Sequence, residues 1–144
     1  MKKIFSPWMF AALVFALGAG CAGLNYDATA VSASDERVLT GTVICPSLLA
    51  LPDHASVLVR VLGTPNAGGP PNVLGEQTIT EPTGWPVKFR IEYRAEDAVL
   101  RRGVNVEARV SAGGKLRFQT VNGHVVTLGN ASTSHEVAVE ALLR

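Results

Sequence analysis

Short segments in which apolar and polar residues alternate constrain the fold of this chain more than any other feature. Between residues 87 and 93, Val87, Phe89 and Ile91 alternate with Lys88 and Arg90. A period of two places successive side chains on opposite faces of a strand, so this segment predicts a half-buried β-strand. Comparable segments cover residues 38–45, 55–62, 73–80, 104–110, 116–120 and 135–142, with a shorter one at 124–128.

Turn-forming residues separate these segments. The stretch from Gly63 to Asn72 is rich in glycine and proline, and Gly113-Gly114 is typical of a hairpin turn. A single helical turn is expected at residues 95–100. The segment 55–62 is apolar on both faces and therefore predicts a central strand. Together these features predict an all-β fold, a small antiparallel β-sandwich of about seven strands.

The first 21 residues follow a different pattern. Lys2 and Lys3 precede an uncharged, largely apolar run at residues 8–20, and Cys21 follows the small residues at the end of that run. This order is typical of a secretory signal peptide, and the run is too short for a bilayer, which takes roughly 20 apolar residues. An uncleaved anchor or an ordinary signal peptide is the alternative.

The stretch from Leu17 to Cys21 resembles a bacterial lipobox, with Gly18 at the position where leucine is usual. The resemblance implies cleavage before Cys21 and acylation of its sulfur, which would attach the chain to a membrane. Because Ala22 follows, enterobacterial sorting rules imply the outer membrane, with the domain facing the periplasm. We expect a signal peptide at 1–20, a lipidated Cys21 with a flexible tether at 21–37, and a domain at 38–144.

Composition limits the partners of the mature chain. Without residues 1–20 it has 11 lysines and arginines and 12 aspartates and glutamates, a balance that argues against nucleic-acid binding. Residues 22–36 are small and polar, which is typical of a flexible tether. Cys45 is the other cysteine of the chain, so acylation of Cys21 leaves no partner for a disulfide. We expect Cys45 to be a small buried apolar residue rather than a redox thiol.

Several motifs resemble those of the YbaY/YscW family of lipoproteins over residues 38–142. They are Gly41-Thr42-Val43, Leu51-Pro52, Pro86-Val87-Lys88-Phe89, and the segments 106–110, 114–118 and 125–129. The resemblance implies a small β-sandwich. One branch of the family comprises type III secretion pilotins, which bind a secretin subunit and help it to reach and assemble in the outer membrane. The role of the other branch is poorly defined.

Common catalytic and metal-binding patterns are missing from the sequence. His54, His124 and His135 lie in three separate segments, and neither H-E-x-x-H nor G-x-S-x-G occurs. We therefore expect no enzymatic activity, no metal site and no cofactor. The remaining charged residues on the strands fit a solvated face.

Trp85 is the candidate for partner binding, because it stands between Gly84 and Pro86 where a loop enters a strand. An exposed tryptophan is typical of interface hot spots, whereas the alternative is a ring folded over the end of the sandwich. The loop from Thr64 to Asn72 is the second candidate. A basic patch is a further possibility, although a mixed face with Glu92 and Glu107 is favoured; its members would be Lys88, Arg90, Arg109, Lys115 and Arg117.

Three classes of function fit these observations. The first is an outer-membrane lipoprotein that binds an envelope protein as a pilotin or chaperone does, with a secretin subunit as the partner implied by the resemblance. The second is a structural or small-ligand-binding envelope lipoprotein without a dedicated client. An enzyme is the third and least favoured class.

Overall fold

The computed structural model describes residues 35–65 and 67–143. The signal peptide, Cys21 and nearly all of the expected tether lie outside the described residues. The strands are β1 (Glu36–Ile44), β2 (Ser56–Gly63), β3 (Asn72–Thr80), β4 (Val87–Arg94), β5 (Val104–Ala112), β6 (Lys115–Gln119), β7 (His124–Val126), β8 (Ser134–Ala138) and β9 (Glu140–Ala141). One short helix, α1 (Asp97–Arg102), joins β4 to β5.

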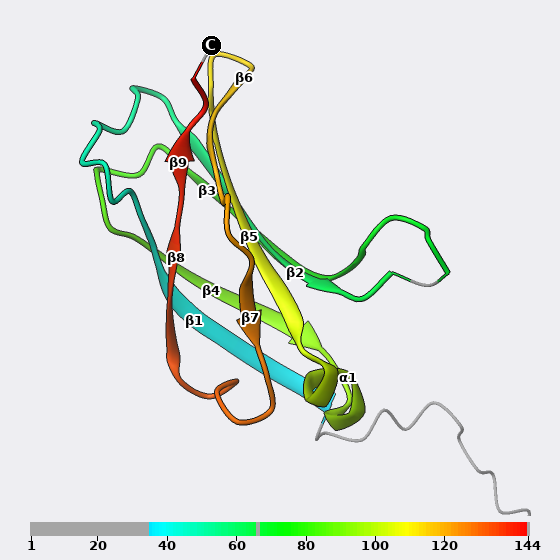
Figure 1. Ribbon diagram of the computed structural model, residues 1–144. Helices are drawn as coiled ribbons and strands as arrows, with labels where there is room; N and C mark the ends of the chain where they lie inside the picture. The colour runs from blue at the N-terminus through cyan, green and yellow to red at the C-terminus, as the bar shows by residue number, and fades with distance from the viewer. Residues whose placement is uncertain (1–34, 66, 144) are drawn as a thin grey trace, which may run out of the picture.

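The strands form two facing sheets, which confirms the predicted β-sandwich (Figure 1). Sheet A has the order β4-β1-β8, and sheet B has the order β3-β2-β5-β6-β9, with β7 also paired to β5. As predicted, β2 is a central strand. Most neighbours are antiparallel, but β8 runs parallel to β1. Periodicity predicts that a segment is a strand and does not determine the direction of the strand beside it.

The core between the sheets consists of the apolar halves of the alternating strands. In β4 every second residue is buried, namely Val87, Phe89, Ile91 and Tyr93. Val57, Val59 and Val61 of β2 are fully buried opposite them. Full burial of one such aliphatic side chain contributes about 1.5–3 kcal/mol, so this alternation is what holds the two sheets together.

The last strand passes from one sheet to the other. The sequence predicts one strand at 135–142, whereas the structure breaks it at Val139 into β8, beside β1, and β9, beside β6. The Val139 N–H donates to the Ile44 carbonyl at 2.9 Å, and the Leu142 N–H donates to the Arg117 carbonyl at 2.9 Å. This crossing connects the two sheets along one side of the sandwich.

The opposite side is covered where β3 approaches β4. A Cβ at Gly75 would lie 2.7 Å from the Glu92 carbonyl oxygen, so this close approach requires glycine. Two residues along, the Gln77 side-chain oxygen accepts the Arg90 N–H at 2.8 Å.

The sandwich has two distinct ends (Figure 1). At the α1 end, β1 begins beside α1, and the Asp35 carbonyl accepts the Ala95 N–H at 3.0 Å. At the hairpin end lie the Gly113-Gly114 turn, the loop from 45 to 55 and the last described residues. β5 runs between the ends with nine residues, a distance of about 30 Å at the usual rise per residue.

Candidate partner-binding groove

A groove of about 620 Å³ lies at the hairpin end of the sandwich. One wall comes from the loop between β1 and β2, and the other comes from β5, β6 and the chain after β8. The lining residues are Leu49, Ala50, Pro52, Asp53, Ala112, Gly113, Arg117, Phe118, Ala141 and Leu142. Two of its leucines are well exposed, Leu49 at 46% and Leu142 at 40%. The exposed leucines of this groove are suited to covering by an apolar surface of another molecule.

Trp85 contacts two of the residues that line this groove. Its indole N–H donates to the Leu49 carbonyl at 2.8 Å, and its ring meets the ring of Phe118 edge-on, with centroids 5.7 Å apart. The ring is partly buried against the core. Of the two interpretations of Trp85, the structure therefore has the ring folded over the end of the sandwich. Its position fixes two residues that line the groove.

More exposed apolar residues surround the groove. Leu48 precedes Leu49 in the same loop, and Leu143 follows Leu142 at the end of the described chain; both side chains are almost fully exposed. Leu48 has a positive φ of 54°. Its N–H donates to the Cys45 carbonyl at 3.1 Å, and this bond fixes the turn that presents Leu48 and Leu49. The turn begins at Cys45, which is buried as predicted.

The loop between β2 and β3, the second candidate, lies far from the groove. It extends from the α1 end (Figure 1). Thr64, Pro65 and Pro71 of this loop line a smaller cleft of about 300 Å³ with Arg102 and Val125. The structure thus separates the two candidates instead of joining them in one surface.

The five basic residues considered as a patch do not share one sheet. Lys88 and Arg90 lie on β4 of sheet A, whereas Arg109 lies on β5 of sheet B. Arg90 pairs with Glu92 at 2.7 Å, and Arg109 pairs with Glu107 at 2.6 Å. The favoured interpretation, a mixed solvated face, is confirmed for these pairs.

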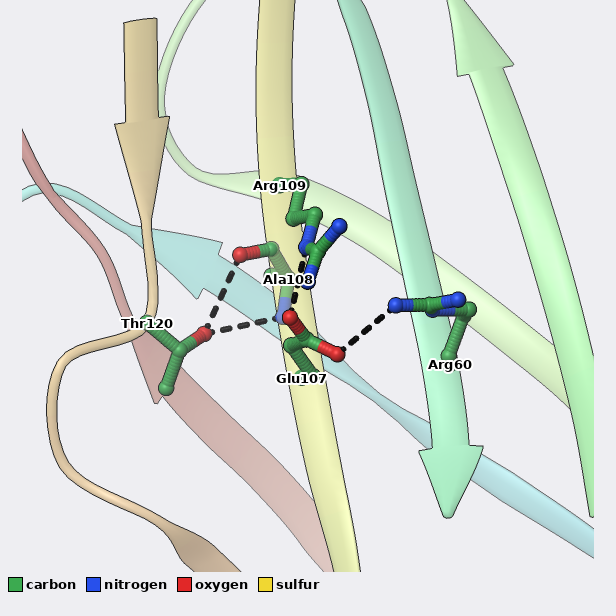
Figure 2. A network of polar contacts seen from close by, with 5 residues as sticks. All are labelled: Arg60, Glu107, Ala108, Arg109 and Thr120. Atoms are coloured by element: carbon green, nitrogen blue, oxygen red, sulfur yellow. Dashed lines mark hydrogen bonds and ion pairs between the residues drawn. The ribbon is translucent and has the colours of Figure 1, made fainter. Parts of the chain in front are cut away.

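Figure 2 shows the polar contacts around Glu107 on sheet B. Glu107 lies between Arg109 and Arg60, and its second oxygen accepts from Arg60 at 2.9 Å. Beside it, the Thr120 hydroxyl accepts the Ala108 N–H at 2.8 Å and donates to the Ala108 carbonyl at 3.2 Å. These bonds tie β2 and the chain after β6 to β5, so this network is structural.

Two of the three histidines form a pair that sequence analysis missed. His124 Nε2 and His135 Nδ1 are 2.9 Å apart, and His135, only 5% exposed, also lies with Nε2 3.0 Å from the Asn130 carbonyl. Since a carbonyl only accepts, His135 Nε2 carries a proton and the neutral pair has His124 as donor. Burial lowers the pKa of His124, and a positive charge on His135 lowers it further. His54 instead pairs with Glu81 at 2.6 Å on the surface.

The His124–His135 pair joins β7 of sheet B to β8 of sheet A. Its residues are 11 positions apart in two different sheets, so no local pattern could have revealed it. Within residues 35–65 and 67–143 no three metal-ligating side chains gather. In the same part of the chain, no helix is long and apolar enough to cross a membrane.

Comparison with known proteins gives a family and a fold relative. The family model described as type III secretion system lipoprotein chaperone (YscW) matches residues 34–139. Among solved structures, the chain is similar to an alternative pilotin from the type II secretion system of Vibrio cholerae, with a TM-score of 0.64 and 25% identity. The match covers 76% of this chain and all of that one. No curated protein matches the chain.

Proposed function

The chain belongs to the YscW family of type III secretion system lipoprotein chaperones, and from that premise we propose that it binds a secretin subunit in the periplasm and assists its arrival in the outer membrane. Acylation at Cys21 would hold the domain at the membrane. The described domain contributes the contact with the client. The similarity to a type II pilotin supports this role, because that protein is also named for a secretion system.

The groove at the hairpin end is the observation on which this proposal rests. Leu49 and Leu142 stand on opposite walls and remain exposed, although Ala112 and Phe118 of the same groove are buried. Leaving such side chains in water is unfavourable, and a client that covers the 46% of Leu49 and the 40% of Leu142 still exposed would gain about 0.6–1.4 kcal/mol for each, the same fraction of a full burial. We place an apolar segment of the client in this groove.

The groove also contains two charged residues that restrict the client. Asp53 lies on the loop wall and Arg117 on the β6 wall. Charged groups at the rim of an apolar contact contribute more to orientation than to affinity. The client segment is therefore expected to have a fixed direction in the groove.

Substitution of the two leucines tests the proposal. The double variant Leu49→Asp/Leu142→Asp should lose client binding at least tenfold, since each charge would have to be desolvated in the complex. Binding would be measured by capturing envelope proteins on the acylated chain after cross-linking in cells, with identification by mass spectrometry. A matched control is Val121→Asp, which introduces a charge at a 59% exposed valine outside the groove.

A secretin captured by the wild type and by V121D, and lost with the double variant, is the expected result. Equal capture of the secretin by all three chains would show that the groove is not the binding site of the client. No secretin captured by any of them would contradict the proposed function itself. Unchanged thermal unfolding of the double variant would show that the loss is not caused by misfolding.

A further inference from the structure

We propose that the α1 end of the domain is a lipid-facing surface, formed by Arg101, Arg102, Val125 and Leu128, which rests on anionic phospholipid headgroups. This inference depends on the proposed acylation of Cys21. It adds an orientation to the proposed function, because it directs the client groove away from the membrane.

The direction from which the chain enters the domain is the first argument. The Asp35 carbonyl is bonded to the Ala95 N–H, so β1 starts beside α1. Residue 35 lies 14 positions after Cys21. A chain of this length reaches at most about 50 Å even when fully extended. An acyl group at Cys21 would therefore keep the α1 end, where the chain enters, within reach of the bilayer.

The charges at this end are the second argument. Arg37 is paired with Asp97, and Arg94 is paired with Glu36. Arg101 and Arg102 are exposed in the last turn of α1, and no ion pair found among the described residues includes them. Their guanidinium groups match the geometry of phosphate oxygens. Besides these pairs, two acidic residues lie near α1, Glu96 before its first turn and Asp35 beside Ala95, both at the opposite end of the helix from Arg101 and Arg102.

Apolar side chains beside these arginines are the third argument. Val125 is 54% exposed and Leu128 is 37% exposed. The Leu128 N–H donates to the Leu100 carbonyl at 3.2 Å, so the chain after β7 is held against α1. Arg102 and Val125 share the cleft of about 300 Å³. Arginines next to exposed aliphatic side chains are typical of surfaces that lie at the headgroup boundary of a bilayer.

The separation of the two ends gives the orientation. Electrostatic attraction to a charged leaflet falls off within a Debye length of about 8 Å at physiological salt. The groove is about 30 Å away along β5. Lys115 and Arg117 at the hairpin end are therefore too far from that leaflet to be attracted to it. Contact at the α1 end leaves the groove open to the periplasm.

Quenching of tryptophan fluorescence by brominated lipids tests this surface in the acylated protein. Trp85 is at the hairpin end, and Trp8 is lost with the signal peptide, so the wild type reports a position away from lipid. Val125→Trp adds a reporter on the proposed surface, and Leu48→Trp adds one at the hairpin end. All three proteins would be reconstituted into vesicles of phosphatidylethanolamine and phosphatidylglycerol with brominated chains.

The lipid-facing surface predicts at least twofold more quenching for V125W than for the wild type or L48W. Adding Arg101→Glu/Arg102→Glu to V125W should reduce quenching to the wild-type level. Adding Lys115→Glu/Arg117→Glu, which reverses two charges at the other end, should leave it unchanged. Replacement of phosphatidylglycerol by phosphatidylcholine should also reduce it.

Two results would overturn the proposal. One is equal quenching of V125W and L48W. The other is quenching of V125W that R101E/R102E does not alter. If R101E/R102E also loses a captured protein, the two arginines bind a protein partner instead of lipid. A failure of the proposed function is distinguishable, because it would appear as absent secretin capture while V125W remained quenched. Mass spectrometry of Cys21 shows separately whether the anchor exists.

Discussion

Gly41 is the glycine that has the least room for a side chain among the described residues. A Cβ there would lie 2.1 Å from the His135 carbonyl oxygen and 2.7 Å from the Phe89 ring. The backbone of β8 cannot move away without leaving β1, to which it is bonded in register. We expect Gly41→Ala to destabilise the domain by about 3 kcal/mol or more, at the upper end of overpacking effects.

Urea unfolding of the acylated chain in detergent measures this loss. Gly129→Ala is the matched control, because the nearest atom to its added Cβ would be 3.9 Å away. A Gly41→Ala protein as stable as the control would show that β1 and β8 are not paired as described.

Cys45 and Trp85 differ in how far the sequence alone could predict their positions. The burial of Cys45 could be predicted, because a lone small apolar residue ends an alternating segment. The orientation of Trp85 could not, since it depends on Leu49 and Phe118, which are 36 and 33 positions away in the chain. A local sequence of loop residues does not say which distant side chains will meet a ring.

At the level of elements, the alternating strands were predictable because burial on one face has a local signature. The division of the last strand between two sheets was not, because it depends on β1 and β6 offering edges in different sheets. The contact between β7 and β8 is of the same kind. It rests on the His124–His135 pair, and its strength should depend on pH.

The sign of that dependence follows from the lowered pKa of His124. A lowered pKa means that the folded state prefers neutral His124, so protons bind more readily to the unfolded chain. The contribution of neutral His124 to the stability of the folded domain is present above the pKa of histidine in the unfolded chain, about 6.5. It decreases as the pH falls through that value. Thermal unfolding from pH 7.5 to 5.0 should therefore show a larger loss for the wild type than for His124→Gln, which keeps a hydrogen-bond donor.

His54→Gln provides the comparison, because His54 is an exposed histidine outside the pair. It should retain the full loss of stability seen in the wild type. A loss in H124Q equal to that of the wild type would show that the pair does not titrate with folding.

For the whole molecule, the family resemblance and the strand pattern were enough to predict the sandwich. The groove was not predictable, because it is assembled from the β1–β2 loop, β5, β6 and the end of the chain. None of these segments has a binding motif of its own. We propose that this composite surface, held at a membrane by an acylated Cys21, carries a client to the outer membrane.

The location of the secretin in cells reports on the groove and the anchor together. Membrane fractionation would measure secretin multimers in the outer membrane of cells that express each variant in place of the wild-type protein. We expect normal multimers with the wild type and V121D, and their loss with both L49D/L142D and Cys21→Ser. Outer-membrane multimers at wild-type levels in the groove variant or the anchor variant would contradict this proposal.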